Sequence, residues 1–243
     1  MEAIMEVKVL ILTGDGVNCE LETALAFSRL GASTDILHIN ELSSGEFILS
    51  QYHILALPGG FSFGDELGSG KVFSLKLKKY LSNQINDFIA DGRPVIGICN
   101  GFQVLCKLGV FNSDKCMVGL AHNDHGRFID RWVDISVKNN ESLWLKGIEK
   151  LKLPVRHGEG RFVFNSEDLS DSNAVPSLFY SEDINGSLQN IAGVCDKSGV
   201  VLGLMPHPEA AVDKDLYPGG VGLGILGDKI FKNSVDYIKD RFQ

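Results

Sequence analysis

The stretch from residue 94 to residue 109, PVIGICNGFQVLCKLG, constrains the fold of this chain more than any other part of the sequence. A short apolar run at residues 95–98 predicts a buried strand, and residues 102–108 predict a helix that ends at Gly109. Cys99 lies at the corner between these two elements. A side chain at such a corner is pushed out over the edge of the sheet.

Small residues flank Cys99 where a strand-to-helix corner needs them. Gly97 and Gly101 leave room for a sharp turn, so the pattern G-I-C-N-G has the logic of a nucleophile elbow with a thiol in place of the hydroxyl group. The start of the following helix directs N–H groups at the sulfur and favours its thiolate form. The alternative is that Cys99 is a small buried hydrophobic residue, a common role for cysteine.

Strands alternate with helices in the first part of the chain. Residues 7–12, 35–39 and 54–57 predict strands, and residues 20–30 predict a helix with Gly31 after its end. This alternation favours a parallel sheet covered by helices. Loops that follow the strands then share one edge of the sheet, where open α/β sheets place their binding sites.

The pattern changes after Gly109. Alternating apolar and polar residues predict half-buried strands, and a pair of apolar runs predicts a hairpin. The segments with these patterns are residues 127–137, 154–164, 177–180 and the hairpin formed by 191–195 and 200–205. We therefore expect an α/β fold with a small antiparallel elaboration, in a single domain over residues 1–243.

The composition is that of an ordinary globular chain, with 44% of the 243 residues hydrophobic and 22% charged. A formal net charge of −8 argues against nucleic acid or an anionic membrane as a partner, because neither is drawn to an acidic surface. No apolar run approaches a membrane span, and acids stand where a signal peptide needs Lys or Arg, so we expect a cytoplasmic chain. The five cysteines include no C-x-x-C motif and favour neither a disulfide framework nor a zinc site.

Two glycine-rich loops follow predicted strands. The first, GDGVNC, has Cys19 in place of the third glycine of G-x-G-x-x-G, so we favour a tight turn over a dinucleotide site. The second, PGGFSFGDELGSGK, has Asp65 where a phosphate-binding loop needs Gly, and Val72 follows it where Ser or Thr is needed. The backbone at Gly59 and Gly60 can still approach a ligand and offer N–H donors, the alternative being a flexible surface loop.

A histidine and a carboxylate follow the second strand of the predicted hairpin, in the segment MPHPE. His207 lies between two prolines, which favour extended backbone, and in an extended segment His207 and Glu209 point the same way. Glu209 can then accept a hydrogen bond from His207 and hold one tautomer of its imidazole. The alternative is a surface histidine in a proline turn.

Other polar groups give weaker signals. His122, Asp124 and His125 match no metal-binding spacing, and a polar loop explains them. Four basic residues could face an anionic substrate or a partner subunit. These four are Arg127, Arg131, Arg156 and Arg161.

In their order and spacing, PGGFSFGD, GICNGFQVL and GLMPHPEA resemble the class I glutamine amidotransferases. NDHGRF and VRHGEGRFV are similar to stretches of the glutaminase components of phosphoribosylformylglycinamidine synthases. The resemblance covers nearly the whole chain. It implies a flavodoxin-like fold, with a mostly parallel open sheet flanked by helices.

The resemblance also implies roles for individual residues. Cys99 is the nucleophile, His207 the general base and acid, and Glu209 the carboxylate that orients the imidazole. Ala210 stands where relatives often carry Arg, a departure that concerns a substrate or partner contact rather than the triad.

Four further residues are implied around the substrate. The family pattern places the backbone N–H groups of Gly60 and Asn100 at the oxyanion, and it places Gly59 and Gln103 against the bound glutamine.

The activity implied by the resemblance is hydrolysis of glutamine to glutamate through a Cys99 thioester. The ammonia passes to a large synthetase subunit, which uses ATP and Mg to convert formylglycinamide ribonucleotide to the amidine in purine synthesis. A small accessory subunit is a further implied partner. No cofactor and no metal are expected in this chain itself.

Three other functions stay open. The chain could be the glutaminase of another synthetase, a cysteine hydrolase that acts alone, or a silent module that binds glutamine or a partner. The stretches NDHGRF and HGEGRF disfavour the first, and the presence of Cys99, His207 and Glu209 together disfavours the last.

Overall fold

Strands and helices alternate as far as Leu108 in the computed structural model, and strands dominate the following part of the chain as far as Leu204. The structure describes residues 5–44, 46–138, 141–217 and 227–242. The strands are β1 (Lys8–Thr13), β2 (Ser33–His38), β3 (Ile54–Leu57), β4 (Val95–Ile98), β5 (Val118–Ala121), β6 (Ile129–Val137), β7 (Lys150–His157), β8 (Arg161–Phe164), β9 (Ala174–Tyr180), β10 (Ile191–Asp196) and β11 (Val201–Leu204). The helices are α1 (Glu20–Ser28), α2 (Lys71–Ala90), α3 (Asn100–Leu108) and α4 (Asp228–Phe242). Several short 3-10 turns lie between them, including η6 (Pro208–Ala211) and η7 (Lys214–Leu216).

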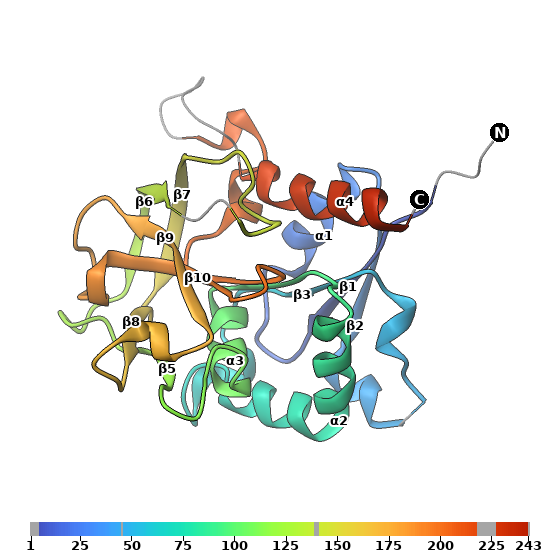
Figure 1. The fold of residues 1–243 in the computed structure, drawn as a ribbon, viewed down its shortest axis with the longest axis horizontal. Helices are drawn as coiled ribbons and strands as arrows, with labels where there is room; N and C mark the ends of the chain where they lie inside the picture. Colours follow the sequence, from blue (N-terminus) through green and yellow to red (C-terminus); the bar gives the residue numbers. More distant parts are fainter. Residues whose placement is uncertain (1–4, 45, 139–140, 218–226, 243) are drawn as a thin grey trace.

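Nine strands form one continuous sheet in the order β2-β1-β3-β4-β11-β10-β9-β6-β7. The five strands from β2 to β11 run parallel to one another. Helices α1 and α4 cover one face of these strands, and α2 and α3 cover the other (Figure 1). The α/β fold class expected from the sequence is confirmed. Because the strands are parallel, the loops after β1, β3, β4 and β11 meet at one edge of the sheet.

The central strands are buried along their whole length. Every residue of β3, β4 and β11 is buried, because helices cover both faces of the parallel half. This accounts for their uninterrupted apolar sequences, ILAL, VIGI and VLGL. The strands predicted at residues 54–57 and 95–98 are confirmed, because their bounds coincide with those of β3 and β4.

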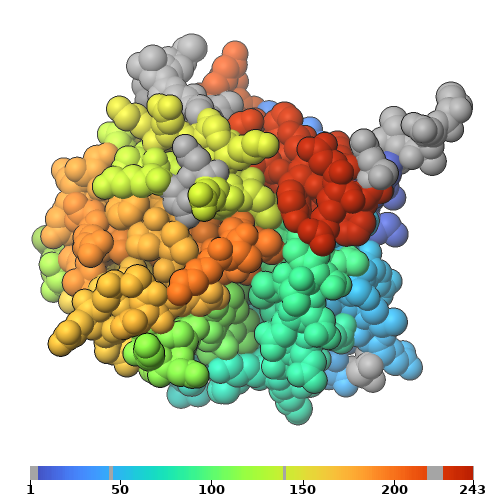
Figure 2. Space-filling model, viewed as in Figure 1, coloured from blue at the N-terminus to red at the C-terminus, as the bar shows by residue number. Residues whose placement is uncertain are grey.

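The remaining strands of the sheet, β10, β9, β6 and β7, are antiparallel to their neighbours. The predicted hairpin is the pair β10–β11, and it joins the antiparallel half to the parallel half. A separate two-stranded ribbon, β5–β8, packs against α3. The antiparallel elaboration is thus part of the same sheet, and it forms the orange and yellow region at the left of the surface in Figure 2.

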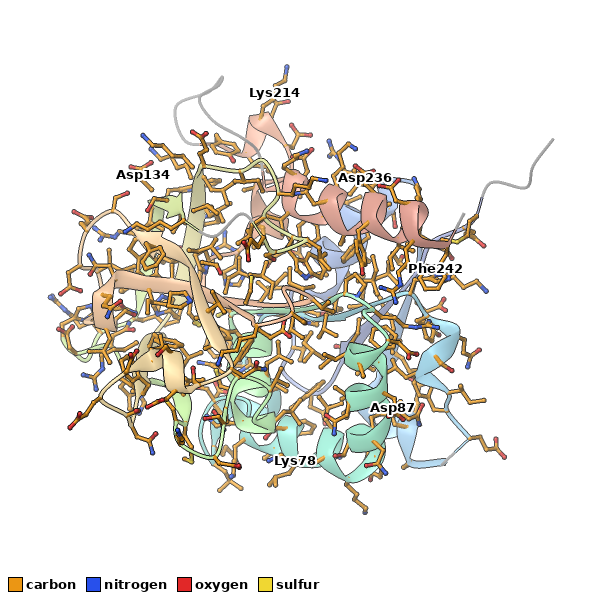
Figure 3. The ribbon with its side chains drawn as sticks, in the orientation of Figure 1. Lys78, Asp87, Asp134, Lys214, Asp236 and Phe242 are labelled. Carbon is orange, nitrogen blue, oxygen red and sulfur yellow. The ribbon has the colours of Figure 1, made fainter. Side chains whose placement is uncertain are left out.

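Helix α4 connects the two halves of the molecule. Its Asn233 side chain donates hydrogen bonds to the carbonyl oxygens of Trp144 and Lys146, each at 2.9 Å. Trp144 is fully buried, and its indole N–H donates to the carbonyl oxygen of Val200 at 2.8 Å. Figure 3 shows α4 running along the upper side of the molecule from Asp236 to Phe242.

Two helix boundaries differ from those expected. The helix predicted over residues 20–30 ends at Ser28, because the N–H of Gly31 donates to Ser28 in a tight turn and Gly31 has a φ of +79°. The helix predicted from residue 102 begins at Asn100, directly after the corner. No helix in the described ranges is long and apolar enough to cross a lipid bilayer.

Candidate active site

Cys99 lies on the corner between β4 and α3, as predicted. Its backbone has φ 50° and ψ −104°, a conformation that is rare for any residue other than glycine. The Cys99 N–H donates to the carbonyl oxygen of Leu204 at 2.8 Å, which fixes the corner to the end of β11. The side chain is only 5% exposed, and its sulfur lies 3.6 Å from the carbonyl oxygen of Arg156.

The two glycines beside Cys99 are required by contacts. A Cβ on Gly101 would lie 1.9 Å from the carbonyl oxygen of Leu57, and a Cβ on Gly97 would lie 2.5 Å from the side chain of Leu105. Neither distance can accommodate a carbon atom. The interpretation of both glycines as the small neighbours of a sharp turn is confirmed.

His207 and Glu209 form a buried pair at the carboxyl end of β11. His207 Nδ1 donates to Glu209 Oε1 at 2.5 Å, and the two residues are 2% and 3% exposed. Burial alone would lower the pKa of His207, but the charge of Glu209 and then the neighbouring Cys99 outweigh it and hold that pKa well above its usual value. The predicted hydrogen bond between the two side chains is therefore present, and Cys99 adjoins it.

The backbone at His207 is hydrogen-bonded to the antiparallel half of the sheet. The N–H of His207 donates to the carbonyl oxygen of Pro154 in β7 at 2.9 Å, and Pro208 begins η6. Glu209 lies within η6, so a single tight turn brings its carboxylate back to the imidazole. Two segments from different parts of the sheet thus determine the direction of the His207 ring.

Gly59 and Gly60 lie beside this pair, after the end of β3. A Cβ on Gly59 would lie 2.8 Å from His207 Cε1, so the absence of a side chain makes room for the imidazole. Gly60 has φ +142°, and a Cβ there would lie 2.7 Å from the Cα of Val17. Within the described part of the chain, the N–H groups of Gly60 and Asn100 donate to no backbone carbonyl.

Asn100 and Gln103 connect α3 to the neighbouring loops. The Asn100 side chain accepts from the Ser62 N–H at 3.3 Å and donates to Gln103 Oε1 at 2.8 Å. Gln103 Nε2 in turn donates to the carbonyl oxygen of Glu159 at 2.5 Å. Both ends of the Gln103 amide therefore have internal partners, and its contact with glutamine stays a prediction.

Sequence reasoning missed Cys19, because it assigned the loop that contains this residue to a tight turn and gave the thiol no role. Cys19 follows β1 at the same edge of the sheet, and a Cβ built on Gly59 would lie 3.3 Å from its sulfur. Burial raises the pKa of the Cys19 thiol, while the neighbouring His207 acts in the opposite direction. The one signal in the sequence was its position in the loop after the first predicted strand, immediately before the first predicted helix.

A cavity of about 600 Å³ opens next to Cys19 and Glu209. Trp132, Arg156 and Ala210 also line it. Cys99 is not among the lining residues, so the cavity reaches the pair from the side of Glu209.

The four arginines singled out in the sequence do not converge on one site. Arg156 lines the cavity beside Glu209, with its Nε 3.6 Å from Asp130. Arg131 forms an ion pair with Glu182 at 2.9 Å and, together with Arg127, borders a separate hollow. Arg161 contributes a buried Nε without a hydrogen-bond partner among the described residues. Of these four, Arg156 alone lines the cavity and can contact a molecule that enters it.

Comparison with known proteins defines the class. Residues 6–238 match the family of CobB/CobQ-like glutamine amidotransferase domains, and the chain belongs to that family.

Within this family, individual relatives indicate the kind of glutamine amidotransferase. The chain is 37% identical to phosphoribosylformylglycinamidine synthase subunit PurQ of Methanococcus maripaludis, over 95% of this chain and 97% of that protein. It is 38% identical to the subunit of the same name from Dehalococcoides mccartyi, over 96% and 98%. Among solved structures, PurLQS from Thermotoga maritima contains a chain with a TM-score of 0.80 and 32% identity, covering 96% of this chain and 99% of that one. The resemblance to the glutaminase components of this synthase is confirmed.

Proposed function

We propose that this chain is the glutaminase subunit of a phosphoribosylformylglycinamidine synthase. The observation that carries the proposal is the buried hydrogen bond between His207 and Glu209 beside the strained corner at Cys99. Such a combination of nucleophile, base and orienting carboxylate suits acyl transfer from an amide. Similarity to PurQ subunits over nearly the full length supports the choice of the synthase.

The first step is attack of the Cys99 sulfur on the side-chain amide carbon of glutamine. His207 takes the thiol proton, and the negative oxygen of the tetrahedral intermediate accepts hydrogen bonds from the N–H groups of Gly60 and Asn100. Loss of one such donor typically costs about 3 kcal/mol of transition-state stabilisation. Gly59 keeps the approach to the thiol open because it has no side chain.

The second step releases the products. The protonated imidazole of His207 donates its proton to the departing nitrogen, and ammonia leaves a thioester between Cys99 and the γ-carboxyl carbon. A water molecule activated by His207 then hydrolyses the thioester and releases glutamate. Glu209 stabilises the protonated imidazole during both steps, in line with the raised pKa of His207.

The neighbouring residues support this chemistry. Gln103 is held by Asn100 and by the Glu159 carbonyl, so it connects the start of α3 to the turn between β7 and β8. Its amide edge is the group we assign to contact glutamine. Ala210 lines the cavity on the far side of Glu209, away from the proposed nucleophile.

The partners follow from the fate of ammonia. We assign its use to a large synthetase subunit that binds ATP and Mg²⁺ and converts formylglycinamide ribonucleotide to the amidine, with a small accessory subunit completing the complex. The thiol, imidazole and carboxylate supply all the groups that hydrolysis needs, so this chain requires no cofactor of its own. We place the chain in the cytoplasm, a reducing compartment that suits its five free cysteines.

One experiment tests the proposal in the assembled complex. We expect Cys99→Ala to lower glutamine-dependent synthesis by about 10⁴-fold or more, because the nucleophile is lost, while ammonia-dependent synthesis is retained. The measurements are glutamate release and amidine formation with ATP, formylglycinamide ribonucleotide and either nitrogen source. Cys116→Ala is the matched control, since Cys116 is a buried thiol outside the site.

Each contrary result favours another function. Glutamate release that is equal with and without the synthetase subunit would favour a hydrolase that acts alone. An assembled complex that releases no glutamate even with unmodified Cys99 would leave a silent binding module.

A further inference from the structure

The Cys19 thiol, the His207 imidazole and the Glu209 carboxylate lie close together, and the proposed hydrolysis does not use the Cys19 thiol. One ligand atom from each of Cys19, His207 and Glu209 lies within 4.8 Å of the other two. Over the ranges that the structure describes, no other group of three or more His, Cys, Asp or Glu side chains meets this spacing. We propose that Cys19, His207 and Glu209 bind a zinc ion and that the ion switches off glutamine hydrolysis.

The donor set suits zinc. Zinc binds thiolate sulfur, imidazole nitrogen and carboxylate oxygen at about 2.0–2.3 Å in a tetrahedron, so that neighbouring donors are about 3.5 Å apart. In this structure the three ligand atoms lie within 4.8 Å of one another, and His207 Nδ1 lies 2.5 Å from Glu209 Oε1, so the side chains must shift to reach the tetrahedral spacing. Hard cations such as Mg²⁺ prefer oxygen ligands and are disfavoured by a thiolate.

The cluster also contains polar atoms without partners. His207 Nε2 and Glu209 Oε2 are buried and form no hydrogen bond with any described group. Cys19 makes a long contact of 3.4 Å, in which its thiol donates to Asn18 Oδ1. Unpaired buried nitrogen and oxygen atoms are costly, so binding an ion here would offset a cost that the metal-free site carries.

An ion can reach the cluster from solvent. The cavity of about 600 Å³ is lined by both Cys19 and Glu209, which places two of the three ligands on its wall. The charged lining residues are four carboxylates, from Glu22, Glu209, Asp213 and Asp215, and two guanidinium groups, from Arg29 and Arg156. This balance favours cations in the cavity.

Binding would stop catalysis through His207, a consequence that rests on the proposed function. The Cys19 thiol and the ligating nitrogen of the His207 imidazole each release the proton that they hold to solvent when they bind the ion. The imidazole, bound to zinc, can no longer accept the proton of Cys99 or donate one to ammonia. Activity would return when a chelator removes the ion.

Cobalt(II) tests the site independently of activity, because thiolate ligation produces a charge-transfer absorption band and four-coordination produces strong visible bands. The Cys99→Ala variant is titrated with Co²⁺, so that the proposed nucleophile cannot contribute. We expect the thiolate band in this variant and in its Cys116→Ala derivative, and we expect its loss in the Cys19→Ser derivative. A band of equal strength in the Cys19→Ser derivative overturns the proposed site.

Zinc inhibition tests the switch in the complete complex. Glutamate release by the chain with Cys99 intact should fall on addition of Zn²⁺ and recover with EDTA. Relative to each protein's own activity without zinc, Cys19→Ser should raise the half-inhibiting concentration by more than about tenfold, because one ligand is lost. Equal sensitivity of both proteins places the inhibiting ion elsewhere and overturns the switch. Cobalt binding through Cys19 without any inhibition by Zn²⁺ keeps the metal site but overturns the switch.

Discussion

Gly101 shows how closely the geometry at Cys99 depends on a single missing side chain. The position at which a Cβ would stand is 1.9 Å from the carbonyl oxygen of Leu57 and 2.6 Å from its carbonyl carbon. These are backbone atoms of β3, which is buried along its whole length and cannot move aside cheaply. The corner at Cys99 and the end of β3 are therefore fixed against each other.

We expect Gly101→Ala to lower the free energy of unfolding by about 3 kcal/mol or more, because β3 and α3 must separate to admit the methyl group. Glutaminase activity should fall with it, since Cys99 and Gly60 lie on the two elements that move. Urea unfolding and glutamate release measure both effects. Gly119→Ala is the matched control, because a Cβ there meets nothing within 4 Å. Equal stability of the two variants would show that the corner tolerates a side chain.

His157 is a buried titratable group that the proposed mechanism does not use. Asn123 Nδ2 donates to the carbonyl oxygens of Arg127 and His157, so its Oδ1 is left to accept from His157 Nδ1 at 3.1 Å. This fixes a neutral tautomer with an unprotonated Nε2, which is buried without a partner in the described part of the chain. Burial, and then the nearby His207 and His125, lower the pKa of His157 to about 4.

This pKa predicts acid sensitivity. Because the folded chain resists protonation of His157 and the unfolded chain does not, the contribution of the neutral ring is complete above pH 6.5 and is lost as the pH falls toward about 4. We expect the free energy of unfolding to decrease by about 3 kcal/mol over this window. Urea unfolding at a series of pH values measures the change. In His157→Asn the same series should be flatter, and an identical slope would contradict the assignment.

At the scale of elements, the conformation of the loop between β3 and α2 depends on the carboxylate of Asp65. Phe63, Gly64 and Asp65 all have positive φ, an unfavourable run for a loop. The Asp65 carboxylate accepts hydrogen bonds from the Ser69 hydroxyl, the Gly70 N–H and the Asn100 side chain at 3.1–3.3 Å. Asp65 thus ties the loop both to itself and to α3.

We expect Asp65→Ala to raise the KM for glutamine by about tenfold, because a loss of about 1.4 kcal/mol of binding free energy corresponds to a tenfold change in affinity. Hydrogen exchange of the loop amides should quicken, while global stability changes little. Glu66→Ala in the same loop is the control, because Glu66 is exposed. An unchanged KM together with unchanged exchange would show that Asp65 does not organise the loop between β3 and α2.

The sequence predicted those elements whose causes are local. β3 and β4 are short apolar runs with a single explanation. The contact between His207 and Glu209 was also predicted, but for the wrong reason, because Glu209 lies in the tight turn η6 rather than in extended backbone. Contacts between distant segments carry no such local signal. The approach of Cys19 to His207 and the hydrogen bond from Gln103 to the Glu159 carbonyl depend on the order of strands in the sheet, which hydrophobic periodicity does not encode.

At the scale of the whole molecule, the parallel and antiparallel halves share one sheet and one connecting helix. We expect residues 1–243 to unfold as a single domain, because separating the halves would break the β10–β11 ladder and bury no new surface. Trp144 is a probe of the junction between the two halves, because its indole N–H donates to the carbonyl oxygen of Val200, next to β11.

Tryptophan fluorescence and far-ultraviolet circular dichroism should therefore give coincident urea transitions. Trp132→Phe removes the other tryptophan, which lies in β6, so that the signal comes from Trp144 alone. A fluorescence transition at lower urea than the dichroism transition would divide the chain into two domains.

The pairing of β4 with β11 also has a consequence for the newly made chain. Val95 pairs with Val201, so the strand that carries the thiol leaves the ribosome long before its neighbour is synthesised. Until β11 pairs with β4, the Cys99 N–H lacks the carbonyl oxygen of Leu204 that accepts its hydrogen bond. The imidazole of His207, which follows β11, is also not yet in place. Contacts so distant in sequence form late. Given the roles proposed for Cys99 and His207, we expect a nascent chain to consume no glutamine until the C-terminal part has emerged and closed the centre of the sheet.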